Sequence, residues 1–245
     1  MSAPIAGRLY GIGLGPGDPE LLTVKAVRII QGAPVVAYFA KAGRRGNARK
    51  IVDSWLPSPC VELPLYYPVT TEIAVGHPDY AARLSAFYAS GAAAIAGHLR
   101  AGRDVALLSE GDPLFYGSFM HLFTRLKGDF AVTVVPGVTG MSGAWAAAQT
   151  PVAWGDDVLM VLPGTLPQTA LIARLADCNG AVIMKIGRNL AKVRAALDEA
   201  GLLARAIYIE RATMEEEVVL PLAQKRDDAA PYFALIVVPG LGRRP

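Results

Sequence analysis

The stretch that decides the fold is Gly11-Ile12-Gly13-Leu14-Gly15-Pro16-Gly17-Asp18-Pro19, which follows an apolar run and precedes a segment of helical period. Four glycines at alternate positions give a backbone that a flat or bulky group can approach closely, and Pro16 stiffens it. A dinucleotide-binding fingerprint does not fit, because Pro16 or Asp18 stands where the third glycine is required. A phosphate-binding P-loop does not fit either, because its Gly-Lys-Ser/Thr ending is missing.

Two further loops of this kind follow apolar runs later in the chain. The second loop spans 109–117 and repeats the Gly-Asp-Pro triplet as Gly111-Asp112-Pro113, and the third spans 135–143 and contains Pro136-Gly137. Each loop alone is typical of an ordinary strand-to-helix turn. Three of them, all predicted at the ends of buried strands, indicate a binding site.

Apolar runs rich in Val and Ile alternate with longer segments of helical period, which predicts an α/β fold. Strands are expected at 9–14, 35–39, 61–65, 105–108, 132–135, 158–162, 181–186, 206–210, 217–222 and 232–238. Helices are expected from Asp18, over 47–55 and 79–101, from near Leu114 and Thr139, and over 167–176 and 190–200. The last three strands have no helices between them, which indicates antiparallel pairing. We therefore expect a largely parallel first domain, 1–150, a mixed second domain, 151–245, and a ligand cleft between them.

The composition is that of an ordinary globular protein of 245 residues, with 53% apolar residues and a net charge of +3. Its two cysteines, Cys60 and Cys178, suit a reducing cytoplasm, and neither belongs to a cluster with zinc-ligand spacing. The start of the chain has no signal-peptide pattern, and no apolar stretch is long enough to span a membrane. These features predict a cytoplasmic protein without a membrane segment or a bound metal.

The small positive excess is concentrated in one segment. Lys41, Arg44, Arg45, Arg49 and Lys50 fall within ten residues that contain no acidic side chain. A solvated loop explains such a run, and so does a binding surface for an acidic ligand. Nucleic acid is a poor match, because no aromatic residues are interleaved with these charges and the rest of the chain is balanced.

The three glycine loops resemble the successive signatures of the tetrapyrrole methylases. The matching segments are Gly13–Pro19, Glu110–Pro113 and Val135–Thr139, and the resemblance continues in the same order from Tyr10 to Pro239. It implies an S-adenosylmethionine-dependent methyltransferase, usually a homodimer, with two α/β domains and the folded cofactor bound between them. Within the family, residues 65–70 and 111–119 are most similar to the enzymes that methylate carbon 20 of precorrin-2 in cobalamin biosynthesis.

The resemblance also assigns the site residues. It places cofactor contacts at Leu14, Gly111, Asp112, Leu114, Thr139, Gly140, Ile186, Ala212 and Thr213. It places substrate contacts at Gly15, Pro16, Tyr67 and Thr70. Many relatives carry Ser or Ala where this chain has Gly140, a change that leaves a main-chain contact intact. Backbone N–H and C=O groups bind much of such a cofactor, so we expect loop shape to matter more than side-chain identity.

The implied chemistry is an in-line displacement at a sulfonium, which needs alignment and water exclusion more than a catalytic triad or a metal. A partly reduced tetrapyrrole is itself a carbon nucleophile. Its ring proton, once the carbon is methylated, has Glu110, Tyr66, Tyr67 or water as possible acceptors. Because the substrate is a polycarboxylate, we also expect the basic segment, with Arg44 and Arg45, to orient it.

Three alternatives stay open at this point. The acceptor is either metal-free precorrin-2 or the cobalt-containing factor II of the anaerobic route. Relatives with other acceptors, such as ribosomal RNA ribose methylases and diphthine synthases, share the fold. A cofactor-sensing module that keeps the loops without catalysis is the non-enzymatic reading, and measured turnover distinguishes it.

Overall fold

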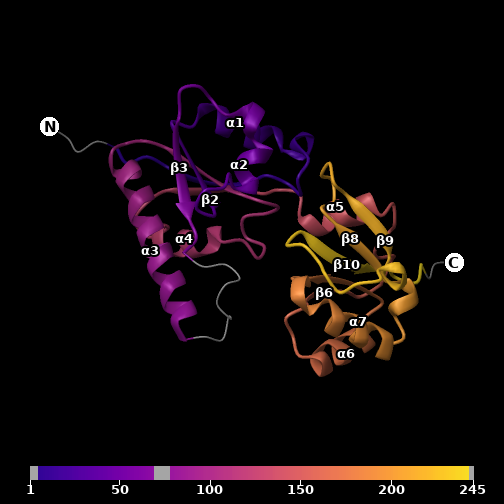
Figure 1. Ribbon diagram of the computed structural model, residues 1–245. Coiled ribbons are helices and arrows are strands. Elements are labelled where there is room, and N and C mark those ends of the chain that lie inside the picture. The colour runs from indigo at the N-terminus through magenta and orange to yellow at the C-terminus, as the bar shows by residue number, and fades with distance from the viewer. Residues whose placement is uncertain (1–4, 69–77, 243–245) are drawn as a thin grey trace. The chain divides into compact units, whose positions relative to one another are not determined.

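The computed structural model describes residues 5–68 and 78–242 (Figure 1). The chain forms two compact units, and the boundary in the sequence falls between Thr139 and Gly140. The first unit contains one sheet of five parallel strands in the order β3-β2-β4-β1-β5. Its elements are β1 (Leu9–Gly13), α1 (Val24–Gly32), β2 (Val35–Ala40), α2 (Asn47–Ile51), β3 (Val61–Tyr66), α3 (Pro78–Arg100), β4 (Val105–Ser109), α4 (Phe119–Leu126) and β5 (Val132–Val135).

Both faces of this sheet are buried, which explains why its strands are almost continuously apolar. Successive side chains of a strand point to opposite faces, so Val35 and Leu107 enter one core while Val36 and Leu108 enter the other. The first core is closed by α3 and α4, and the second by α1 and α2. Strands β4, β1 and β5 are parallel neighbours in this sheet, so their carboxyl ends lie side by side.

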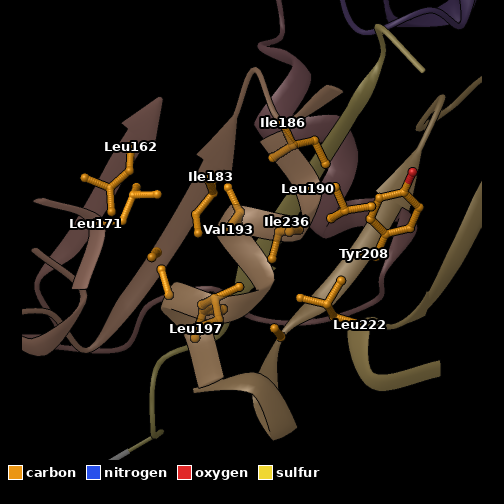
Figure 2. Close-up of a cluster of buried hydrophobic side chains, with 14 of the residues drawn as sticks. Leu162, Leu171, Ile183, Ile186, Leu190, Val193, Leu197, Tyr208, Leu222 and Ile236 are labelled. Atoms are coloured by element: carbon orange, nitrogen blue, oxygen red, sulfur yellow. The ribbon is translucent and has the colours of Figure 1, made fainter. Parts of the chain in front are cut away.

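The second unit contains a mixed sheet in the order β6-β7-β10-β8-β9, in which only β6 and β7 run parallel. Its elements are α5 (Gly140–Ala147), β6 (Leu159–Pro163), α6 (Gln168–Ala176), β7 (Gly180–Met184), α7 (Leu190–Glu199), β8 (Ile207–Glu210), β9 (Val218–Pro221) and β10 (Ala234–Val238). Figure 2 shows the core between α7 and this sheet, where Val193 and Leu197 lie against Ile183 and Ile236. The predicted antiparallel pairing of the last three strands is confirmed.

Helix α5 belongs to the second unit by its packing. Ala144 lies in the core on the other face of the second sheet, together with Val182 and Val237. The sequence-based boundary after residue 150 falls beyond this helix, at a break of proline and glycine that marks the end of α5 rather than the division between the two units.

The predicted strands agree with the structure, since each of the ten is present with ends shifted by two residues or fewer. The expectation of a helix from near Leu114 is wrong, because α4 begins at Phe119. Residues 112–118 form a turn instead, in which the Asp112 carboxylate accepts a hydrogen bond from the Leu114 N–H and Tyr116 has a left-handed φ of 54°. The helix expected over 47–55 is two pieces, α2 and a 3-10 turn at Asp53–Trp55.

Two smaller expectations concern the environment of the chain. No helix among residues 5–68 and 78–242 is long and apolar enough to cross a membrane. Cys60 and Cys178 are not joined in a disulfide, and both are half-buried.

Candidate functional site

The first and second glycine loops are joined by backbone hydrogen bonds in the first unit. The Gly111 N–H donates to the Gly15 carbonyl at 2.8 Å, and the Gly15 N–H donates to the Gly111 carbonyl at 3.3 Å. Leu14 adds a bond from its N–H to the Ser109 carbonyl at 2.9 Å. The ends of β1 and β4 are thus continued as a small antiparallel bridge beyond the parallel sheet.

The third loop meets the other two at backbone distance. A Cβ atom added at Gly137 would lie 2.1 Å from the Gly111 carbonyl oxygen, and one added at Gly13 would lie 2.4 Å from the Gly137 nitrogen. Contacts this short are never seen for real Cβ atoms, and the neighbours are backbone atoms that cannot rotate away. Gly13, Gly111 and Gly137 therefore form a junction, here called the glycine junction, in which neither Gly13 nor Gly137 has room for a side chain.

Asp112 connects the second loop to the third. One of its carboxylate oxygens accepts the Leu114 N–H at 2.9 Å, and the other accepts the Gly137 N–H at 3.1 Å. Hydrogen bonds to an ionised acceptor are stronger than those between neutral groups. The Asp of the Gly-Asp-Pro triplet thus fixes the shape of both loops and leaves Leu114 half exposed, at 49%.

Several residues assigned to the cofactor or the substrate have buried side chains. Leu14 and Ile186 are fully buried in the cores of the first and second units, and Figure 2 shows Ile186 within the latter. Gly15 and Pro16 are buried as well. Any contact that Leu14 or Ile186 makes with a ligand must therefore use the main chain, as the resemblance to backbone-reading enzymes implies.

Three of the four assigned residues of the second unit, Ile186, Ala212 and Thr213, lie at or beside strained backbone. Lys185, which precedes Ile186, has a φ of 56°, and Arg211 and Thr213, which flank Ala212, have φ values of 48° and 65°. Left-handed backbone costs free energy for residues other than glycine and is concentrated at functional sites. This strain was not predictable from residue type, because none of these three residues is glycine or asparagine.

The three candidate proton acceptors have different environments. Glu110 is half-buried, and its carboxylate accepts the Ala48 N–H at 3.2 Å. Tyr66 is 50% exposed. It borders a shallow pocket of about 200 Å³, lined by Leu63, Pro64, Leu65, Tyr66, Phe87, Ser90, Gly91 and Ala94. The Tyr67 hydroxyl donates to Ser118 Oγ at 2.5 Å.

Burial raises the pKa of Glu110, and the Ala48 N–H only partly offsets this effect. A carboxyl group whose pKa is higher in the folded chain stabilises the fold fully below its unfolded pKa, and that contribution is lost as the pH rises through the folded pKa. We therefore expect Glu110→Gln to raise the Tm at pH 7 by a few degrees, since about 1 kcal/mol shifts the Tm of such a chain by 2–4 °C. The gain should shrink near pH 4, which thermal unfolding at the two pH values measures.

The control for this substitution is Glu199→Gln, at an exposed position in the last turn of α7. This substitution also removes one carboxylate, but the carboxylate of Glu199 is already in contact with water. Its removal relieves no desolvation, so we expect no comparable gain in Tm at pH 7. A Tm gain for Glu110→Gln that is equal at both pH values, or a loss at pH 7, would contradict the role of desolvation.

The basic segment is not a set of five free cations. Arg49 is only 8% exposed and holds Glu62 through two hydrogen bonds of 2.7 and 3.0 Å, with a third bond of 2.8 Å to Asp53. These bonds raise the pKa of Arg49 and lower that of Glu62. Burial, with a 2.9 Å hydrogen bond to Glu62, raises the pKa of Tyr38 to about 12. Arg49 is therefore part of the fold, and the expectation that it faces a substrate is wrong.

The other charges of the segment differ from Arg49. The side chains of Lys41, Arg44, Arg45 and Lys50 are all exposed. Arg45 pairs with Asp53 at 2.6 Å. These ion pairs were not predictable from residues 41–50 alone, because the acidic partners of Arg45 and Arg49 are Asp53 and Glu62, which lie outside that segment. Thr70, assigned to the substrate, lies outside the described residues.

Ser118 and Tyr88 are not among the site residues predicted from the sequence, yet their hydroxyls are 3.1 Å apart beside Tyr67. Ser118 precedes α4, where a serine is typical of a helix cap, so its residue type gave no functional signal. Among residues 5–68 and 78–242, no group of three or more His, Cys, Asp or Glu side chains is arranged to hold a metal ion.

Comparison with known proteins places this arrangement among characterised folds. The chain is 57% identical over its full length, and over the full length of the relative, to a precorrin-2 C(20)-methyltransferase of Sinorhizobium sp.. It is 30% identical, over 95% of its length and 96% of the relative's, to a cobalt-precorrin-2 C(20)-methyltransferase of Salmonella typhimurium. The uroporphyrin-III C-methyltransferase of Thermus thermophilus, solved with S-adenosylhomocysteine, has the same fold at 24% identity, with a TM-score of 0.65 over 95% of this chain and 92% of that one.

A family model also matches most of the chain. The model describes the tetrapyrrole (corrin/porphyrin) methylases, and it covers residues 8–225, which include all three glycine loops and most of each unit. The match and the full-length relative agree with the resemblance that the loops carry. The chain belongs to the tetrapyrrole (corrin/porphyrin) methylase family.

Proposed function

We propose that this protein transfers a methyl group from S-adenosylmethionine to carbon 20 of precorrin-2, giving precorrin-3A and S-adenosylhomocysteine. The observation that carries the proposal is the 57% identity to a precorrin-2 C(20)-methyltransferase, over all 245 residues and the full length of the relative. The identity to the cobalt-precorrin-2 enzyme is 30%, which favours metal-free precorrin-2 as the acceptor. The proposal places the protein in the cobalamin pathway.

The residues present suit S-adenosylmethionine as the methyl donor. The glycine junction packs backbone on backbone, and a Cβ added at Gly140 would meet no atom within 4 Å, so that stretch of main chain is uncrowded. We assign Leu14, Gly111, Asp112, Leu114 and Thr139 of the first unit to the cofactor, together with Gly140, Ile186, Ala212 and Thr213 of the second. When bound, the cofactor supplies an electrophilic methyl group on a neutral leaving group.

The protein's own contribution to the reaction is alignment and proton removal. Methylation of carbon 20 leaves a proton on that carbon, and its loss restores the conjugated ring. The raised pKa of Glu110 makes its carboxylate a stronger base than an ordinary glutamate, so we assign it proton removal. Tyr66 and Tyr67, at the end of β3, are assigned to the tetrapyrrole, with Gly15, Pro16 and Thr70.

The test is to incubate the protein with S-adenosylmethionine carrying a ¹³C-labelled methyl group and with either precorrin-2 or its cobalt complex. We expect the mass of one methyl group to be added to precorrin-2, and the label to appear at carbon 20 by NMR. Faster turnover of the cobalt complex would reverse the choice of acceptor. Cofactor binding without methylation of either compound would favour the sensing module instead.

The basic segment gives a prediction for substrate affinity. Arg44 is exposed, whereas Arg45 is paired with Asp53, so Arg44 is the better placed of the two to bind a carboxylate. We expect Arg44→Ala to raise the KM for the tetrapyrrole roughly tenfold, the value of about 1.5 kcal/mol for one charged hydrogen bond. Arg45→Ala should raise it less, because Asp53 already neutralises that cation.

Steady-state kinetics at low and high salt measure this effect, since added salt should reduce the difference between wild type and Arg44→Ala. Arg226→Ala, at an exposed position in the second unit, is the control for a change in net charge. If Arg44→Ala and Arg226→Ala have the same KM, the segment does not orient the substrate.

We further propose that the protein is a cytoplasmic homodimer, with no nucleic acid or membrane among its partners. The family resemblance supports the dimer, and the unpaired Cys60 and Cys178 are compatible with a reducing compartment. Sedimentation of the purified protein over a range of concentrations tests the dimer directly.

A further inference from the structure

Ser118 stands at the N-cap of α4, yet its side chain forms no capping hydrogen bond. Its hydroxyl interacts with two tyrosines instead, accepting from the Tyr67 hydroxyl at 2.5 Å and lying 3.1 Å from that of Tyr88. A serine cap contributes about 1 kcal/mol to a helix. The chain forgoes that stabilisation here, and the hydroxyl joins β3, α3 and α4.

The ring of Tyr67 is already held from its sides. It stacks on Phe39 with ring centres 5.5 Å apart and planes 23° apart, and it meets Phe87 with ring centres 4.9 Å apart. These contacts hold the plane of the ring and do not involve the hydroxyl, since a phenylalanine ring would make them equally well. The bond to Ser118 adds a directional contact at the oxygen itself and ties that end of the ring to α4.

Tyr88 provides the fixed point of this group. It is 6% exposed, and its ring stacks on His121 with ring centres 4.2 Å apart and planes 22° apart. The Arg125 guanidinium carbon lies 5.8 Å from the centre of the Tyr88 ring. Tyr88 is therefore immobilised between α3 and α4, and through Ser118 it can set the position of a side chain beyond the end of β3.

We infer that Ser118 and Tyr88 are positioning residues, which hold the Tyr67 hydroxyl in place against the tetrapyrrole. This inference rests on the proposed function, because it takes Tyr67 as a substrate-contacting group. The hydroxyl chain Tyr67–Ser118–Tyr88 acts on the reaction only through Tyr67. Loss of Ser118 should thus have the same consequence as loss of the Tyr67 hydroxyl, and no further one.

The test is a double-mutant cycle measured as kcat and KM for methylation. We expect Ser118→Ala and Tyr67→Phe each to lower kcat roughly tenfold or more, as small misplacements of reacting groups do. In the Tyr67→Phe background, Ser118→Ala should have no further effect on kcat. In the protein that keeps Tyr67, Ser118→Thr, which retains a hydroxyl at this position, should keep most of the wild-type activity. Additive effects of the two substitutions would overturn the inference.

Two controls separate positioning from a general loss of structure. Ser85→Ala and Tyr80→Phe remove hydroxyls from the same helix, α3, at positions outside the hydroxyl chain, and should leave kcat unchanged. Tyr88→Phe should lower kcat less than Ser118→Ala, because the bond between Tyr67 and Ser118 remains. An effect of Tyr80→Phe as large as that of Tyr88→Phe would contradict the assignment.

A spectroscopic measurement tests the hydroxyl chain without turnover. In protein labelled with ¹³C at the tyrosine ζ position, the Tyr67 resonance, assigned with Tyr67→Phe, should move in Ser118→Ala and stay in Ser85→Ala. An unmoved Tyr67 resonance in Ser118→Ala would overturn the inference even if wild-type methylation is observed. If the wild-type protein methylates neither acceptor, the proposed function fails while the spectra still report on the hydroxyl chain.

Discussion

Gly137→Ala is expected to abolish cofactor binding and to destabilise the first unit by about 3 kcal/mol, the upper range for overpacking. The new Cβ would lie 2.1 Å from the Gly111 carbonyl oxygen and 2.8 Å from the Gly13 Cα. Relief would require one of the three loops to move. Those loops extend β1, β4 and β5, adjacent strands of a sheet buried on both faces, so any movement breaks backbone hydrogen bonds as well.

Denaturant unfolding and calorimetric titration with S-adenosylmethionine measure the two effects of Gly137→Ala. Gly97→Ala is the matched control, because a Cβ there meets no atom within 4 Å and the residue lies exposed within α3. That substitution should stabilise the protein by up to about 1 kcal/mol through helix propensity. A Gly137→Ala protein with wild-type stability and cofactor affinity would show that the glycine junction is not required.

The strands were predictable because parallel strands buried on both faces must be apolar throughout. Val35 and Val36 illustrate this, since each enters a different core. Propensity placed the start of α4 near Leu114, whereas the helix begins at Phe119. The Asp112 side chain binds the Leu114 N–H, and this local bond holds a turn in place of the first turn of a helix.

The site was predictable where it consists of backbone and motif, and much less where it depends on partners far away in the chain. The three loops were found because glycine is the residue that such close approach requires. Arg49 appeared as one cation in a run of five, because its partner Glu62 lies thirteen positions away on β3. Likewise, the strain at Lys185 and Thr213 leaves no trace in residue type, since tertiary contacts impose it.

Asp112→Ala is expected to weaken S-adenosylmethionine binding about a hundredfold, because it removes two charge-assisted hydrogen bonds, each contributing about 1.5–3 kcal/mol. The lost bonds run to the Leu114 N–H and the Gly137 N–H, which belong to different loops. Asp112→Asn should have an intermediate effect of about tenfold, since its amide keeps one acceptor oxygen and places N–H groups where the other stood. Calorimetric titration of the three proteins measures the series.

Asp104→Ala distinguishes loop shape from general stability, because Asp104 accepts the Arg8 N–H at 2.7 Å just before β4 begins. The bond is of the same kind as those of Asp112, but it lies at the opposite end of the same strand. Both substitutions should therefore lower the free energy of unfolding, whereas only those at Asp112 should change cofactor affinity. If Asp104→Ala and Asp112→Ala lowered cofactor affinity equally, affinity would depend on the stability of the sheet and not on the geometry of the loops at the carboxyl ends of its strands.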